Sequence, residues 1–182
     1  MRLVYREDDV NKDTDVSVLK YIHEQFVNNH LIHTVSFLCD GLEKNVDLIK
    51  YILSTKNWDL TIHGWNHHNY SLMDKNQIED ELDRCILKID NLFGTVPEKW
   101  YLPFNGWTKD KEFDLVPYVA NIAFYHGVDV DNDCYHISDA VIELELGRKL
   151  NTDTVYFHSW DREDLKLLPT LLFLTTQKSC KS

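Results

Sequence analysis

Carboxylate and imidazole side chains recur at the ends of short β-like runs in this 182-residue sequence. These residues are Asp8, Asp9, His63, His67, His68 and His158. Carboxylates and imidazoles bind divalent metal ions, and both transfer protons near neutral pH. In α/β proteins, functional groups gather at the carboxyl ends of the strands. The pattern therefore favours a metal site with acid–base groups beside it.

Asp8 and Asp9 form an adjacent pair of carboxylates. Taken alone, such a pair is more often a solvated loop than a site. In a functional site, one carboxylate would bind a cation and the other would accept a proton from water held by that cation. Neighbours on a straight strand point to opposite faces, so both can serve one site only where the backbone bends.

Three histidines fall within six residues of the segment 62–69. His63 and His67 are separated by three residues, a common metal-ligand spacing that is also frequent by chance on helices. A solvated histidine cluster would explain the same residues. Two imidazoles and one carboxylate would form a set with open positions, which suits Zn²⁺ or a neighbouring first-row ion that activates water.

His158 ends the last β-like run. A lone histidine at a strand end is more often a structural group than a catalyst. The near-neutral pKa of imidazole nevertheless makes His158 the natural general acid if it faces the metal.

The hydrophobic pattern alternates β-like runs with helical ones. We expect a first strand that begins at residues 3–5 and further strands over 33–38, 58–63, 99–103, 122–126, 141–144 and 154–158. Helices are expected over 15–29, 45–53, 74–93, 111–121 and 163–176. This alternation predicts a parallel α/β architecture. A complete eight-fold barrel takes about 250 residues. The chain is therefore expected to form one domain, 1–182, with a short, distorted (β/α) barrel of about seven parallel strands.

Composition excludes several classes of function. The net charge is −11, with 30 acidic and 19 basic side chains, whereas nucleic acids and anionic membranes attract clustered Lys and Arg. No run approaches the roughly 20 apolar residues that span a bilayer, and the N-terminus does not resemble a signal peptide. The four cysteines form no C-x-x-C pair, which is typical of reduced thiols. We expect a cytoplasmic protein with neither nucleic acid nor membrane as partner.

The order of the motifs resembles the polysaccharide deacetylase (NodB-homology) family of carbohydrate esterases over residues 3–160. In that family the first motif ends in Asp-Asp, and the second supplies two histidines separated by three residues. The resemblance implies that Asp8 is the catalytic base and that a metal ion is bound by Asp9, His63 and His67.

Two later motifs extend the resemblance. The segment Tyr101-Leu102-Pro103-Phe104-Asn105 is similar to the third motif, which implies that the backbone N–H of Phe104 contributes to an oxyanion hole. The segment that ends at His158 resembles the late motif whose histidine is the general acid. The Asp that supports this histidine in the family has two ambiguous counterparts here, Asp129 and Asp131.

Two positions depart from the family pattern. Tyr101 stands where the family has the arginine that orients the catalytic Asp, and Gly64 stands where Ser or Thr is usual. Arg6 lies two residues before Asp8, so on an extended segment it shares the same face. We hypothesise that Arg6 takes over the orienting role.

The resemblance implies hydrolytic removal of acetyl groups from an N-acetylated or O-acetylated sugar or oligosaccharide. The expected cofactor is a divalent ion, Zn²⁺ first, with Co²⁺, Ni²⁺ or Mn²⁺ as alternatives. Trp65, Asn105 and Trp160 are candidate substrate-binding residues, although core or rim packing explains the tryptophans equally well. Two alternatives stay open: a related metal-dependent hydrolase of another amide or C–N bond, and a catalytically silent sugar- or metal-binding domain. The sequence does not determine the oligomeric state.

Overall fold

A computed structural model of the chain describes residues 3–106, 116–131 and 134–179. Within these residues, seven strands form one parallel sheet in the order β5-β4-β3-β2-β1-β7-β6. The strands are β1 (Val4–Val10), β2 (His33–Leu38), β3 (Trp58–Gly64), β4 (Lys99–Trp100), β5 (Asp129–Val130), β6 (Cys134–His136) and β7 (Thr154–His158). The helices are α1 (Val16–Asn28), α2 (Val46–Ser54), α3 (Lys75–Phe93), α4 (Val116–Phe124), α5 (Ile137–Glu145) and α6 (Arg162–Ser179). None of these helices, over the ranges described, is both long and apolar enough to cross a membrane.

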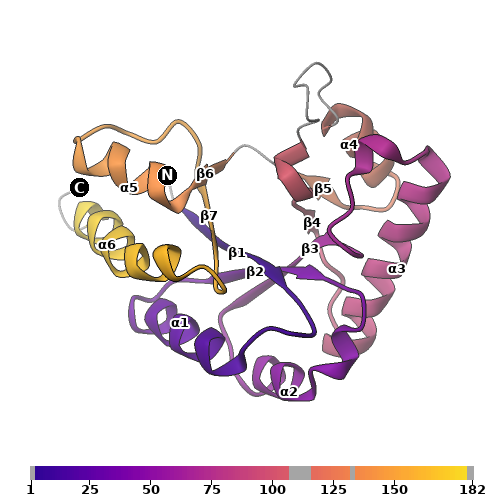
Figure 1. Cartoon of the computed structure of the whole chain (residues 1–182), viewed down its shortest axis with the longest axis horizontal. Coiled ribbons are helices and arrows are strands. Elements are labelled where there is room, and N and C mark those ends of the chain that lie inside the picture. The colour runs from indigo at the N-terminus through magenta and orange to yellow at the C-terminus, as the bar shows by residue number, and fades with distance from the viewer. Residues whose placement is uncertain (1–2, 107–115, 132–133, 180–182) are drawn as a thin grey trace.

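The sheet curls with helices around its outside, and the predicted distorted (β/α) barrel is confirmed (Figure 1). The two edge strands are consecutive in the chain, because β5 ends at Val130 and β6 begins at Cys134. The four Cα–Cα steps between these residues span at most about 14 Å, so the two edges must approach each other. The sheet is therefore a strongly curled, incomplete barrel rather than an open layer.

Successive side chains of β1 point alternately to the outer face of the sheet and to the barrel interior. On the outer face, Tyr5 packs against Phe26 of α1, with ring centres 5.5 Å apart. On the inner face, the guanidinium of Arg6 lies 4.3 Å from the ring centre of Tyr101 and 5.2 Å from that of Tyr156. Apolar side chains therefore fasten the strand to its helices, while the barrel interior holds charged groups.

Helix α3 begins and ends where the sequence indicates. Asp74 and Gln77 form a reciprocal capping box, and Gly94 ends the helix with a φ of 68°. The buried residues of α3 are Ile78, Glu81, Leu82, Cys85 and Ile89. Glu81 is the charged member of this stripe, and a buried carboxylate is costly unless polar partners satisfy it.

Two of the predicted strands are wrong. Residues 122–124 end α4, and residues 141–144 lie inside α5. Both runs are short and apolar, and such a pattern alone does not distinguish a buried helical turn from a buried strand. Val141 and Leu144 do lie in the core, three residues apart on one side of α5. The true strands β5 and β6 have only two and three residues, too few to produce a periodic signal.

Two other predicted elements differ in extent. β4 ends at Trp100, and a short 3₁₀ turn over Pro103–Gly106 takes up the rest of the predicted strand. Of the predicted helix over 111–121, residues 111–115 lie outside the described residues, and 116–121 are helical within α4. The remaining predicted helices and strands are present close to their expected ranges.

His23 of α1 is a buried imidazole in the outer core. It is 2% exposed and stacks on Trp58 with ring centres 3.6 Å apart. His33 of β2 is fully buried beside it, and its Nε2 lies 2.9 Å from a carboxylate oxygen of Glu7. Burial first, and then the proximity of His33, lower the pKa of His23 to about 4. His23 is therefore neutral in the folded protein at pH 7.

The low pKa of His23 should make the fold sensitive to acid. An unfolded histidine has a pKa of about 6.5, so the unfolded chain takes up this proton first as the pH falls. The free energy of unfolding should decrease by about 3 kcal/mol through His23 between pH values of about 6.5 and about 4. We expect His23→Phe to flatten this dependence in urea unfolding measured at several pH values.

The control for this substitution is His30→Asn. His30 is exposed and has a φ of 58°, which Asn tolerates. We expect this variant to keep the parent's pH dependence. An equally steep dependence in His23→Phe would show that His23 is not its source.

Candidate metal centre

The backbone of β1 bends at the pair of carboxylates. Asp9 has a φ of 62°, and the pairing of β1 with β2 shifts register between Glu7 and Val10. A bulge of this kind re-aims the side chains on either side of it. The bend that the adjacent pair requires is therefore present, and it lets Asp8 and Asp9 point to different partners at one edge of the sheet.

Asp9, His63 and His67 come together at the carboxyl ends of β1 and β3. Oδ1 of Asp9 lies 3.4 Å from Nε2 of His63 and 3.4 Å from Nε2 of His67. One candidate ligand atom from each residue lies within 4.8 Å of the other two. One carboxylate and two imidazoles at these separations match a zinc-type donor set with positions left open.

The hydrogen bond of His63 fixes which of its ring nitrogens faces the group. Nδ1 of His63 lies 2.7 Å from the carbonyl oxygen of Tyr101, and a carbonyl only accepts, so Nδ1 carries the proton. In the neutral ring, Nε2 then presents a lone pair toward Asp9. Oδ1 of Asp9 is itself buried without a hydrogen-bond partner in the described structure. A cation, either a proton on the imidazole or a metal ion, can lie between these two atoms, so the residues fit a divalent metal ion when the imidazoles are neutral.

The charge state of Asp9 also suits a metal ligand. Burial on its own raises the pKa of this carboxyl group, but the imidazoles of His63, His67 and His158 outweigh it and lower the pKa to about 2. Asp9 is therefore ionised throughout the physiological pH range.

Two residues with positive φ face each other beside the group. His67 has a φ of 49° and Phe104 a φ of 57°, a conformation that costs a non-glycine residue of the order of 1 kcal/mol. Their rings meet edge to face with centres 4.6 Å apart. The exposed Phe104 therefore lies next to a candidate ligand, where the sequence places the oxyanion-hole N–H. That role of Phe104 stays a prediction.

Asp8 is held by Arg6 rather than by the metal group. Nε and Nη2 of Arg6 donate to the two carboxylate oxygens of Asp8 over 2.7 and 2.6 Å. Arg6 is fully buried and Asp8 is 2% exposed, and the ring of Tyr101 lies against the guanidinium. A bidentate pair of this kind fixes both the position and the plane of the carboxylate. Arg6 thus lies where the sequence hypothesis places it, and Tyr101 supports Arg6 from the position of the missing arginine.

His158 lies between Asp9 and a carboxylate that the sequence interpretation misses. Its Nε2 is 3.9 Å from Oδ2 of Asp9, and its Nδ1 is 3.3 Å from Oδ2 of Asp164. Burial alone lowers the pKa of His158, but the hydrogen bond to Asp164 and the charges of Asp8 and Asp9 raise it above its usual value. Asp164 therefore fixes the orientation of the imidazole, and the neighbouring carboxylates stabilise its protonated form.

Asp164, and neither Asp129 nor Asp131, is the carboxylate that contacts Nδ1 of His158 in the structure. It accepts the backbone N–H of His158 over 2.9 Å and also lies 3.2 Å from Nε2 of His136. Asp129 is exposed on the edge strand β5, and Asp131 lies near Tyr101 and influences its pKa. In the sequence, Asp164 is an ordinary acidic residue in the first turn of α6. Nothing in the sequence marks Asp164 as the partner of His158.

The aromatic candidates separate into two groups. Trp160 is 65% exposed, donates from Nε1 to Oδ2 of Asp9 over 3.3 Å and lies 4.8 Å from the ring of His158. Trp65 packs instead under Arg84 of α3, with the guanidinium 3.8 Å from the ring centre. The structure therefore brings Trp160 to the group and turns Trp65 toward α3. The side chain of Asn105 lies outside the described residues.

Fold and donor set together define an incomplete α/β barrel with a metal-type site at the carboxyl edge of its sheet. A sequence profile described as polysaccharide deacetylase matches residues 8–116, and the chain belongs to this family. A search of curated protein sequences finds no match.

Solved structures share the fold at low sequence identity. A family 4 carbohydrate esterase from Streptomyces lividans, in complex with acetate, is 15% identical with a TM-score of 0.73, over 97% of this chain and 88% of that one. A polysaccharide deacetylase from Bacillus cereus is 14% identical with a TM-score of 0.76, over 98% and 89%. A family 4 pseudoenzyme from Bacillus anthracis is 14% identical with a TM-score of 0.75, over 97% and 61%.

Replacing the imidazole of His67 should weaken metal binding without unfolding the chain. We expect His67→Ala to weaken Zn²⁺ binding by more than about 100-fold, beyond the roughly 10- to 100-fold typical of groups that only orient a ligand. Competition with a chromophoric chelator measures the dissociation constant. His126→Gln is the control, because His126 pairs with Asp83 and is outside the candidate donor set. Equal affinities of His67→Ala and the parent would rule out His67 as a ligand.

Proposed function

We propose that this chain is a metal-dependent hydrolase that removes acetyl groups from N-acetylated or O-acetylated sugars. The observation that carries the proposal is the convergence of the Asp9–His63–His67 donor set with Asp8 and His158, two acid–base residues on neighbouring strands. The pairing of β1 with β7 sets Asp8 directly opposite His158. Membership of the polysaccharide deacetylase family supports the class of substrate.

Asp9, His63 and His67 would hold the metal ion. A bound divalent ion supplies polarisation of the acetyl carbonyl and a lowered pKa of water at the open positions. Zn²⁺ is the first expectation for one carboxylate and two imidazoles, with Co²⁺, Ni²⁺ and Mn²⁺ as alternatives.

Asp8 is the proposed base. Its carboxylate accepts the proton of the attacking water, and the two hydrogen bonds from Arg6 keep it from rotating away. Each carboxylate oxygen has a second lone pair, so the ion pair leaves acceptor capacity for water. Arg6 therefore positions the base without occupying all of its acceptor sites.

His158 is the proposed acid. Its Nδ1 pairs with Asp164, which leaves Nε2 on the Asp9 side to donate a proton to the departing amine or alcohol. The backbone N–H of Phe104 is proposed to stabilise the negative oxygen of the tetrahedral intermediate, an effect worth about 3–4 kcal/mol per donor in other enzymes.

Trp160 and the net charge bear on the substrate. An exposed indole beside Asp9 offers a flat face against which a sugar ring can pack. The net charge of −11 repels anionic polymers but not a neutral acetylated sugar, and it attracts the cationic amine that deacetylation produces.

Acetate release tests the proposal. We expect the metal-loaded protein to release acetate from a panel of N- and O-acetylated oligosaccharides. Chelation should abolish this activity, and added Zn²⁺ should restore it. His63→Ala should remain inactive with or without added metal. Acetate release that survives both chelation and His63→Ala would refute the proposal.

Two other functions are separated by the same measurements. Turnover of small amides without turnover of acetylated sugars would indicate a related hydrolase of C–N bonds. Bound metal without turnover on any substrate would indicate a silent binding domain. The similar fold of the Bacillus anthracis pseudoenzyme and the Tyr101 substitution are the observations that favour this second alternative.

Replacing Arg6 should impair catalysis but not metal binding. Arg6→Lys keeps the charge but loses the bidentate contact with Asp8, and misplacement of a catalytic group by about 1 Å can cost about 100-fold in rate. We expect kcat to fall at least about tenfold while the Zn²⁺ dissociation constant and the circular dichroism spectrum stay as in the parent. Arg148→Lys, at an exposed surface ion pair, is the control. An unchanged kcat in Arg6→Lys would contradict the orienting role.

A further inference from the structure

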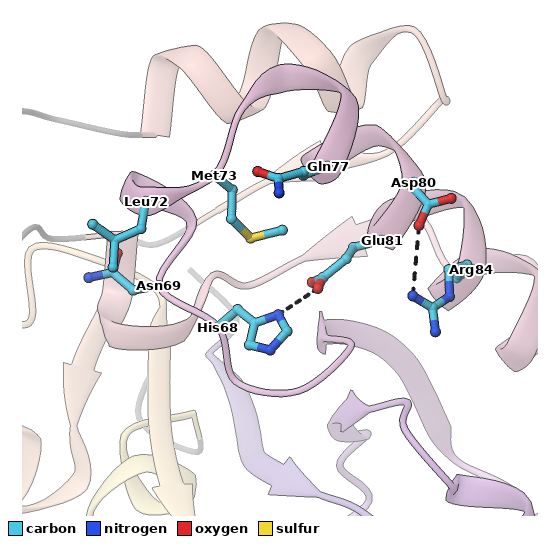
Figure 2. A pocket seen from close by; sticks show the side chains of 8 residues that line it. All are labelled: His68, Asn69, Leu72, Met73, Gln77, Asp80, Glu81 and Arg84. Carbon is cyan, nitrogen blue, oxygen red and sulfur yellow. Dashed lines mark hydrogen bonds and ion pairs between the residues drawn. The ribbon is translucent and has the colours of Figure 1, made fainter.

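The loop between β3 and α3 carries the candidate ligand His67 and is anchored through one carboxylate. Glu81 of α3 is 5% exposed. Its Oε1 lies 2.5 Å from Nδ1 of His68, and its Oε2 accepts a hydrogen bond from the hydroxyl of Tyr70 over 3.0 Å. Figure 2 shows Glu81 reaching from the helix to His68. The two oxygens of Glu81 therefore hold His68, which follows His67 directly, and Tyr70, three residues after His67.

Tyr70 connects this anchor to the other candidate histidine. Its side chain is buried, and its ring meets Trp100 edge to face with centres 5.0 Å apart. A Cβ built on Gly64 would lie 2.7 Å from the Tyr70 hydroxyl oxygen, so only glycine leaves room for it. Gly64 directly follows His63. The hydroxyl of Tyr70 thus lies between Glu81 and the backbone next to His63.

A carboxylate at position 81 matches the donors that face it. Burial, and after it the charge of Glu81, raise the pKa of Tyr70 well above its usual value, so the hydroxyl keeps its proton and donates. With Nδ1 of His68 as the second donor, each contact uses a different oxygen of the Glu81 carboxylate. This accounts for a charged residue within the otherwise apolar stripe of α3.

Tyr70 packs in the core, but the outer part of the loop borders a pocket. This pocket of about 440 Å³ lies between the loop and α3 and is lined among others by Leu72, Met73 and Gln77 (Figure 2). The positive φ of His67, 49°, is an unfavourable conformation that persists only where the surroundings enforce it. The two bonds of Glu81 cross from α3 to the loop next to this residue.

We propose that Glu81, acting through His68 and Tyr70, is a positioning residue that holds His67 in the geometry for metal binding. This inference rests on the metal centre of the proposed function. Groups that orient a ligand without touching the metal typically contribute about 10- to 100-fold to metal affinity. Glu81 therefore preorganises the donor set from outside it.

Metal affinity of folded variants tests the inference. We expect Glu81→Met, which removes both acceptors at similar volume, to raise the Zn²⁺ dissociation constant about 10- to 100-fold in chelator competition. Tyr70→Phe removes one of the two bonds and should give a smaller rise. Glu79→Met, the same substitution on the same helix at a surface ion pair with Lys75, should bind Zn²⁺ like the parent.

The outcomes separate the possible failures. Parent-like Zn²⁺ affinity in Glu81→Met, even with a lower melting temperature, would assign Glu81 a structural role only and overturn the inference while the proposed function stands. If Glu81→Met does not fold, Tyr70→Phe decides the question in the same assay. Absence of Zn²⁺ binding by the parent would overturn the proposed metal centre and this inference with it.

Discussion

The bulge in β1 is the constraint on which the candidate site depends. A straight strand would send Asp8 and Asp9 to opposite faces of the sheet, so one of them would be lost to the site. The positive φ at Asp9 and the register shift beside it let Asp8 face Arg6 while Asp9 faces the histidines. The backbone conformation therefore gives the two neighbouring carboxylates different partners. β3 and β7 each contribute one further side chain at this edge, His63 and His158.

The residues around the bulge form layers at increasing distance from the candidate metal position. Asp9, His63 and His67 form the donor set, while the carbonyl of Tyr101 and the carboxylate of Glu81 orient its imidazoles directly or through the loop. The hydrogen bond from Nδ1 of His63 to the carbonyl of Tyr101 leaves Nε2 of that ring to face the group. The buried charges around the site each have a partner of opposite charge or a hydrogen-bond partner, because an unpaired buried charge is costly.

The sequence predicts the donor set and the barrel but not the supporting contacts. Asp8, Asp9, His63 and His158 are recognisable because parallel strands bring their carboxyl ends to one edge. Asp164 and Glu81 carry no such mark: one is a first-turn acidic residue and the other a carboxylate within an amphipathic helix, and only tertiary packing gives each a partner. The strands β5 and β6 escape prediction for a different reason, since two or three residues contain no period.

The location of Arg6 also has an evolutionary consequence. The proposed base and its orienting cation lie two residues apart on one strand, and the ring of Tyr101, at the position where the resembled motif has arginine, lies against that cation. One arrangement has arginine at position 6 and the other has it at position 101. A change from one to the other by single substitutions passes through a chain with two buried arginines or with none. Leaving a buried charge unpaired costs about 3–5 kcal/mol, a large share of the stability of a domain this size. Positions 6 and 101 are therefore expected to change together during divergence, so that a homologue with arginine at one of them lacks it at the other.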